Sequence, residues 1–216
     1  MTRPSPPAFV RLACLFAASG CATLTNFESA KTLKQGGWQV AIEGRVLRTG
    51  SSAAGETQLW PAVAVRRGMT DRFELGLRAG GRPEVFAKFQ LRDGERVAIA
   101  FSQTLGLWRW DTTVSQWQGW SRSALPIGVS FGGHELVMSP GVHLALGRTD
   151  EGVVGFIAMP SASVGFIWRP LKWLGFMPQV TVGASAVQLA QGITIVGGGV
   201  ALEGGLAVIG GGLEGW

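Results

Sequence analysis

The sequence predicts an all-β protein, a single antiparallel up-and-down transmembrane β-barrel of about ten strands, with eight or twelve strands as alternatives. Three observations predict this fold. Many segments alternate apolar and polar residues with the period of a β-strand. After the first two dozen residues, no run approaches the roughly 18 apolar residues of a spanning helix. Charged residues make up only 15% of the chain and the mean hydropathy is +0.25, whereas about one-quarter of an ordinary soluble domain is charged.

The alternation is clearest in residues 73–79, which follow a tight polar turn at residues 68–72. One face of this segment is apolar and the other is polar or small: Phe73, Leu75, Leu77 and Ala79 against Glu74, Gly76 and Arg78. Such a pattern is typical of a strand that separates two different environments. We expect lipid on the apolar side and a polar lumen on the other.

The same alternation recurs along most of the chain, in segments long enough for a tilted strand to cross a bilayer. The predicted strands are residues 38–48, 58–67, 73–80, 84–92, 96–110, 120–131, 136–147, 153–168, 173–187 and 193–202. Short connections, such as residues 68–72 and 132–135, alternate with longer ones, such as 49–57 and 111–119. This alternation of short turns and long loops is typical of membrane barrels. We therefore place the barrel at residues 37–203.

Residues 1–20 have the pattern of a secretory signal peptide, with Arg3 and Arg11 around a short apolar run and small residues before Cys21. Removing this segment leaves 17 basic and 14 acidic residues, a net charge of 17 − 14 = +3. The basic residues are scattered, which excludes a nucleic-acid footprint and leaves at most a weak preference for anionic surfaces. Residues 21–36 are polar and unpatterned and are predicted to be a tether, in which one helical turn could form around residues 26–33.

Tryptophans occur near the predicted strand ends or in loops, as expected for girdles at the two membrane interfaces. The alternative is that they pack in a soluble core. The predicted interface anchors are Trp38, Trp60, Trp108, Trp110, Trp120, Trp168 and Trp173.

The polar faces of the first four strands carry long charged side chains, whereas the later strands supply mainly Gly, Ala and Ser. Two interpretations remain open. The charges form an ion-paired plug, because buried charges require partners, or they line a narrow aqueous path that sets solute preference. The candidate lumen residues are Glu43, Arg45, Arg66, Glu74, Arg78, Glu84, Lys88 and His143.

The sequence contains no convincing catalytic or cofactor site. His143 shares its face with Ser139, but four residues along a strand separate them by about 13 Å, beyond hydrogen-bond reach. The two histidines lack the spacing of a metal site. Residues 210–215 match G-x-G-x-x-G, but the chain leaves no room for the helix that a dinucleotide site requires. We therefore predict no enzyme, no cofactor and no metal. Residues 204–216 form a glycine-rich terminal segment whose pairing is left open.

The sequence Ala18-Ser19-Gly20-Cys21 resembles a bacterial lipobox, in which the cysteine becomes the lipidated first residue. Together with the turn and strand at residues 68–76 and the repeated amphipathic strands, it resembles small bacterial outer-membrane β-barrel proteins, lipidated ones among them. The resemblance implies an outer-membrane location with a periplasmic, lipid-anchored N-terminus. Ordinary cleavage that leaves a free Cys21 thiol is the alternative.

The function expected from this resemblance is a structural or narrow-pore role, with the bilayer as partner and small solutes or lipid as further ones. Two alternatives remain. One is a soluble periplasmic β-sandwich or lipid-binding lipoprotein, and the other is a barrel enzyme that modifies lipids. The oligomeric state is not predicted.

Overall fold

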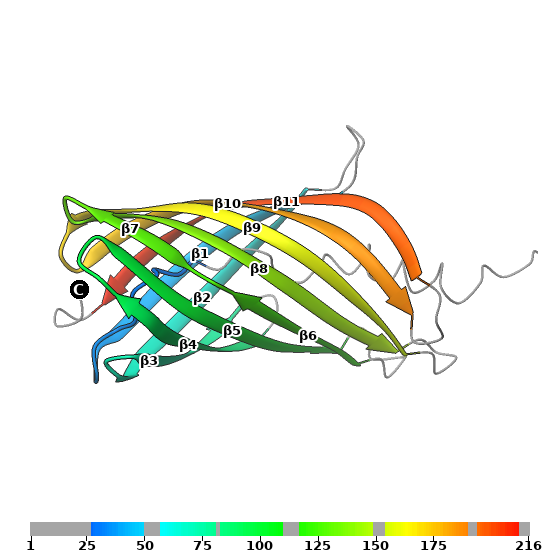
Figure 1. The fold of residues 1–216 in the computed structure, drawn as a ribbon, viewed down its shortest axis with the longest axis horizontal. Coiled ribbons are helices and arrows are strands. Elements are labelled where there is room, and N and C mark those ends of the chain that lie inside the picture. The colour runs from blue at the N-terminus through cyan, green and yellow to red at the C-terminus, as the bar shows by residue number, and fades with distance from the viewer. Residues whose placement is uncertain are drawn as a thin grey trace, which may run out of the picture.

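The computed structural model describes residues 27–49, 57–80, 83–109, 117–148, 154–189 and 194–211 (Figure 1). All regular structure in these residues is β. The strands are β1 (Trp38–Thr49), β2 (Thr57–Thr70), β3 (Phe73–Ala79), β4 (Glu84–Asp93), β5 (Val97–Arg109), β6 (Trp117–Ala124), β7 (Ile127–Phe131), β8 (His134–Arg148), β9 (Val154–Leu171), β10 (Leu174–Leu189) and β11 (Thr194–Gly211).

The strands close into an antiparallel barrel, which confirms the predicted fold class. Successive strands pair with each other, and β1 pairs with β11 from Gln39 opposite Gly211 to Thr49 opposite Ala201. Both β6 and β7 lie between β5 and β8, so they are two halves of one strand interrupted at Leu125 and Pro126. Proline has no backbone N–H for the ladder, which accounts for the interruption. The eleven segments therefore occupy ten positions around the barrel.

The two ends of the barrel differ. Tight turns join β2 to β3, β4 to β5, β7 to β8 and β9 to β10 at the end that lies on the left in Figure 1, here called the turn end. Gly132 and Gly133 form the β7–β8 turn with φ values of +56° and +84°, the left-handed conformation that a two-residue hairpin requires. The connections at the opposite end, the loop end, lie largely outside the described residues.

The predicted boundary between the barrel and a separate C-terminal segment is wrong. The last strand does not stop near residue 203: β11 continues to Gly211 and pairs with both β1 and β10 over residues 204–210. The sequence did not predict this part of the strand, because its glycines interrupt the alternation of apolar and polar side chains. Residues 212–216 lie outside the described part of the chain.

The exterior of the barrel is apolar. Ile42, Leu59 and Leu77 are 62%, 71% and 63% exposed, and most outward positions of the strands carry similar side chains. The interior, in contrast, holds buried charged and polar side chains from nearly every strand. This arrangement is the reverse of that in a soluble protein, in which large apolar side chains are the ones most often buried.

Residues 27–36, predicted as part of a tether, instead lie against the inner wall at the turn end. They contain no helical turn. Phe27 and Ala30 are 0% exposed and Glu28 is 1% exposed. We call residues 27–36 the luminal segment. Its residues are mostly small or polar, so no periodic pattern in the sequence indicated that it would be buried.

Candidate functional site

The candidate site is the inner wall of the barrel where it binds the luminal segment. Glu135, near the start of β8, contacts the middle of the segment with both carboxylate oxygens. Its Oε1 accepts a hydrogen bond from the Ala30 amide at 2.8 Å, and its Oε2 accepts one from the Ser29 hydroxyl at 2.7 Å. Arg169 of β9 lies 3.3 Å from the same carboxylate and supplies a counter-charge.

The β2–β4 wall contacts the end of the segment that leads into β1. Gln90 Oε1 accepts from the Thr32 amide at 2.6 Å, and Gln90 Nε2 donates to the Ala30 carbonyl at 3.0 Å. Glu74 Oε2 accepts from the Leu33 amide at 2.9 Å. These three contacts involve main-chain atoms of the segment, as does the Glu135 contact with Ala30. The wall therefore supplies the hydrogen bonds that a buried backbone needs away from water.

Two cations bind carbonyl groups of the segment. Lys88 Nζ donates to the carbonyls of Ser29 and Lys31 at 3.1 and 2.9 Å, and it also lies 2.9 Å from the Glu74 carboxylate. The Arg66 guanidinium donates to the Phe27 carbonyl. Carboxylates therefore accept from amides of the segment and cations donate to its carbonyls. Hydrogen bonds that involve a charged partner are the stronger kind.

A second cluster of charges, contributed by β1, β3 and β4, is paired internally. Arg78 Nε lies 2.9 Å from Glu43, Arg45 Nη2 lies 2.6 Å from the same carboxylate, and Arg78 also pairs with Glu84. All four side chains are 3% exposed or less. A network of this kind is stable only while each charge keeps its partner. We call these four residues the ion network.

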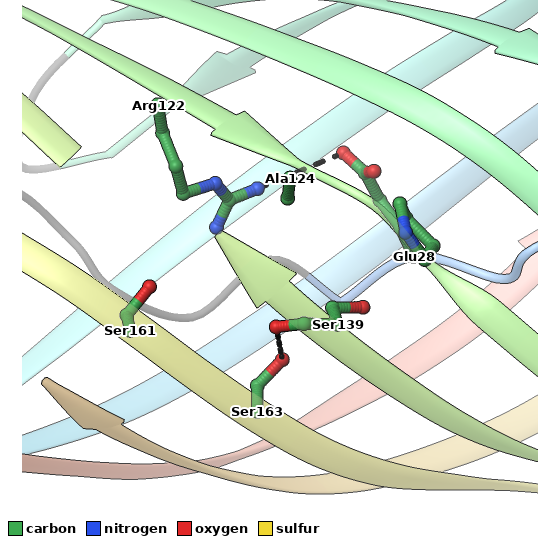
Figure 2. Close-up of a pocket in the computed structure, with 7 residues that line it drawn as sticks. Glu28, Arg122, Ala124, Ser139, Ser161 and Ser163 are labelled. Carbon is green, nitrogen blue, oxygen red and sulfur yellow. Dashed lines mark hydrogen bonds and ion pairs between the residues drawn. The ribbon is translucent and has the colours of Figure 1, made fainter. Parts of the chain in front are cut away.

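Glu28 connects the luminal segment to the opposite wall. Its carboxylate lies 3.9 Å from the guanidinium of Arg122 on β6. Figure 2 shows the two groups facing each other beside a small hollow that is bordered on its other side by Ser139, Ser161 and Ser163. The pairing of Glu28 with Arg122 means that the segment contributes charge to the interior as well as backbone.

Glycines make room for the segment. A Cβ on Gly68 would lie 2.0 Å from the Lys34 carbonyl oxygen, and one on Gly128 would lie 2.7 Å from Ala30 Cβ. A Cβ on Gly205 would lie 2.6 Å from Phe27 Cζ. These three inward-facing glycines, on β2, β7 and β11, therefore let the segment lie closer to the barrel wall than a residue with a side chain would.

The structure places all eight predicted lumen residues inside the barrel: Glu43, Arg45, Arg66, Glu74, Arg78, Glu84, Lys88 and His143 are each 3% exposed or less. It brings Glu43, Arg45, Arg78 and Glu84 together. It separates from them Glu74 and Lys88, which bind the luminal segment. His143 lies opposite Arg122 and Met159 on the neighbouring strands, and among the described residues neither of its ring nitrogens has a hydrogen-bond partner.

The tryptophans divide into two groups. Trp38, Trp168 and Trp173 are about half exposed at the turn end. Trp120 is 5% exposed and lies on the inward face of β6 with Arg122, so its assignment as an interface anchor is wrong. Trp60 is half-buried on the inward-facing side of β2, where Ala62 and Ala64 are also buried, and it too was misassigned.

Three of the predicted positions fall wholly or partly outside the described residues. Trp108 lies in β5 but its side chain is outside the described part of the structure, and Trp110 and Cys21 are outside it altogether. Position along a strand was the signal used for the tryptophans. It cannot distinguish the two faces, which are set by whether a residue number is odd or even along the strand.

Sequence reasoning missed Arg122, Glu135 and the luminal segment. Glu135 was assigned to a turn, although it is the second residue of β8. Arg122 alternates with Trp120, which was assigned to the membrane interface. The imbalance between a charged wall and a wall of small residues was visible in the sequence. That imbalance could have indicated that an additional element occupies the space.

No helix in the described residues is long and apolar enough to span a membrane. Within the same residues, no three His, Cys, Asp or Glu side chains converge as a metal site would require.

The sequence matches no protein-family model and no curated protein. Among solved structures, the barrel is similar to Neisserial surface protein A, with 8% identity and a TM-score of 0.34 over 80% of this chain and 96% of that one. It is similar to the translocator domain of the autotransporter NalP from Neisseria meningitidis, with 9% identity and a TM-score of 0.40 over 94% and 96%.

A third similar structure is the outer membrane protein OprG from Pseudomonas aeruginosa, with 10% identity and a TM-score of 0.32 over 85% of this chain and 97% of that one. Similarity at this level concerns the barrel architecture alone. We therefore infer the location and role of this chain from the side chains on its own exterior and in its own interior.

Proposed function

We propose that this chain is a bacterial outer-membrane β-barrel whose lumen is closed by its own luminal segment, and that its role is structural rather than conducting. The observation that carries the proposal is the binding of residues 27–35 by hydrogen bonds from several walls of the barrel, chiefly to main-chain atoms. A segment bound in this way occupies the path that a solute would take.

The membrane location is supported by the exterior. Leu, Val, Ile and Phe side chains cover the outward face of most strands and are 37–71% exposed. A closed barrel satisfies its backbone hydrogen bonds internally, so such a surface is stable in hydrocarbon. In water the same surface would be a large apolar patch, which argues against the soluble periplasmic alternative.

The turn end has the aromatic residues expected at a membrane interface. Trp38, Trp168 and Trp173 are exposed there, and Phe89 and Phe131 are 45% and 49% exposed near the same end. Amphipathic rings favour the headgroup level of a bilayer. We propose that these residues form the girdle at the periplasmic interface, because short turns face the periplasm in outer-membrane barrels.

A narrow pore is the second candidate, favoured by the hollow between Arg122 and the three serines. Polar groups of this kind line aqueous paths in channels. The luminal segment lies between that hollow and the turn end, so we rank the closed barrel first. Our proposal assigns no reaction to the barrel. We expect lipid profiles to be unchanged when the protein is deleted or when His143→Ala is introduced, and a changed profile would favour the enzyme alternative.

Two experiments test the proposal. Extraction of washed membranes should release the protein only with detergent, and unboiled samples should migrate differently from boiled ones on gels. In planar bilayers, the wild-type protein should show conductance indistinguishable from the bare membrane. Recovery of Cys21→Ser in buffer would overturn the membrane barrel. Stable wild-type channels would overturn the closed lumen in favour of the narrow pore.

A further inference from the structure

The small hollow inside the barrel has polar walls. The polar side chains that border it are those of Glu28 on the luminal segment, Arg122 on β6, Ser139 on β8, and Ser161 and Ser163 on β9. Ser163 donates to the Ser139 carbonyl at 3.5 Å, whereas the hydroxyls of Ser139 and Ser161 form no hydrogen bond with any described residue. In Figure 2 the Ser161 hydroxyl points toward the Arg122 guanidinium. Across from Glu28, the hollow therefore presents a positive charge and two hydroxyls that are available to a ligand.

The wall around Arg122 is rich in hydrogen-bond donors. Thr104 of β5 lies opposite Arg122, and Arg122 lies opposite His143 of β8, so these inward-facing residues form a row across neighbouring strands. Each of the three side chains is 3% exposed or less. Among the described residues, the Thr104 hydroxyl and both ring nitrogens of His143 have no hydrogen-bond partner. Buried polar groups are normally paired, and no side chain of this row carries a negative charge, so the surroundings of the hollow favour an anion.

The size of the hollow and the chemistry of its walls limit the class of ligand. The hollow has room for about one water-sized group, which is too small for a sugar or a phosphate ester. A guanidinium offers only N–H donors and no acceptor, and each serine hydroxyl can donate a further hydrogen bond. A monovalent anion accepts hydrogen bonds from all of these donors, and hydrogen bonds with a charged partner are the stronger kind.

We propose that the hollow binds one monovalent anion of the size of chloride, between the Arg122 guanidinium and the hydroxyls of Ser139 and Ser161. The guanidinium has donors on more than one edge, so it binds the Glu28 carboxylate with one edge and the ion with another. The ion and the Glu28 carboxylate repel each other, because both are negative and both lie beside the same cation. The Glu28 charge therefore limits the affinity of the site. This inference concerns the interior of the barrel and is independent of whether the lumen is closed or conducting.

The stability of the protein, refolded in detergent, should depend on chloride. Chloride replaces gluconate at constant ionic strength, so that the screening of the ion pairs stays the same. We expect the equilibrium constant for unfolding to fall about tenfold between about 1 and about 100 mM chloride, as mass action predicts for a dissociation constant of about 10 mM. Unfolding that is independent of chloride would overturn the proposal.

Four variants test whether the effect arises at the hollow. Arg122→Gln should abolish the chloride dependence, and Ser161→Ala should weaken it. Glu28→Gln removes the repelling charge and should shift the dependence to about tenfold lower chloride concentrations. Ser121→Ala, on the outward face of β6, is the matched control and should respond to chloride as the wild type does. An unchanged chloride dependence in both Ser161→Ala and Glu28→Gln would overturn the proposal, whether or not Arg122→Gln folds.

Crystals of the refolded protein grown in bromide would locate the ion. We expect an anomalous difference peak within hydrogen-bond distance of Arg122 and Ser161. An ordered water at this position with no anomalous signal would contradict the proposal. A bromide peak combined with chloride-independent unfolding would also contradict it, because the ion would then bind at crystal concentration only. These results leave the proposed function untouched, since conductance and membrane extraction test that separately.

Discussion

The two sides of the lumen contribute to the bound segment in different ways. The wall of β1–β4, here called the charged wall, carries Arg66, Glu74 and Lys88 and supplies hydrogen bonds to the segment's main chain. The wall of β7–β11, here called the small wall, supplies space through residues such as Gly128 and Gly205. Glu135 is the main charged contact from that side. The two walls are therefore complementary to the luminal segment in different ways: one binds its main chain, and the other leaves space for it.

The largest effect should come from breaking the ion network on the charged wall. Arg78→Ala removes the partner of both Glu43 and Glu84 and leaves two buried carboxylates under-compensated. We expect the free energy of unfolding in lipid vesicles to fall by about 4 kcal/mol, measured by denaturant titration.

Arg67→Ala is the matched control for Arg78→Ala. Arg67 lies on the outward face of β2, with its guanidinium 5.2 Å from the centre of the Trp38 ring. Loss of this exposed contact should cost about 1 kcal/mol or less. Equal losses from the two variants would contradict the interpretation that the internal charges hold the charged wall together.

The second-largest loss of stability should come from weakening Glu135, the principal charged contact of the small wall with the luminal segment. Glu135→Gln keeps the size of the side chain but removes its charge, so the ion pair with Arg169 is lost and the hydrogen bonds to Ser29 and Ala30 are no longer charge-assisted. We expect a loss of about 2 kcal/mol in unfolding free energy. Hydrogen exchange of the Ala30 amide should become faster. Glu95→Gln, in an exposed turn, should change neither measurement.

A smaller effect should follow from filling the space in the small wall. Gly205→Ala places a methyl group 2.6 Å from Phe27 Cζ and equally close to the Gly44 carbonyl oxygen. We expect overpacking to cost about 1–3 kcal/mol. The adjacent Gly204 has only one atom near its would-be Cβ, the Gln179 carbonyl oxygen at 4.0 Å. Gly204→Ala should therefore be nearly neutral, and equal destabilisation by the two variants would argue against a snug segment.

The smallest effect is expected outside the lumen. Gln103 and Ser123 form a 2.6 Å hydrogen bond on the outward faces of β5 and β6. Replacing both partners, as in the double variant Gln103→Leu with Ser123→Ala, removes a polar pair without leaving either side chain unsatisfied. The change in unfolding free energy should be within about 0.5 kcal/mol or stabilising. A loss as large as that from Glu135→Gln would show that this exterior pair has a role of its own.

Much of the barrel could be predicted from local pattern. The alternation in residues 73–79 identified both the strand and the inward positions of Glu74 and Arg78, because a period of two assigns every residue to a face. The same rule failed at β11, where glycines remove the pattern. It was not applied to Trp120, which was assigned from its position near a strand end although its parity places it in the lumen.

The luminal segment could not be predicted in this way, because its burial depends on long-range contacts. Ala30 is bound by Glu135, which lies 105 residues away in the sequence. Neither residue has a local pattern that indicates the other. Only the unequal side-chain volumes of the two walls could have indicated that the interior holds more than its own side chains, and the sequence analysis did not draw that conclusion.

The most direct test of the central claim compares channel activity with and without the luminal segment. A variant that lacks residues 27–35 should show stepwise conductance in planar bilayers, whereas the wild type and a control variant that lacks residues 22–26 should remain at the level of the bare membrane. Comparable conductance in the wild type, or a silent variant without residues 27–35 that still migrates as a folded barrel, would contradict the claim that this segment closes the lumen.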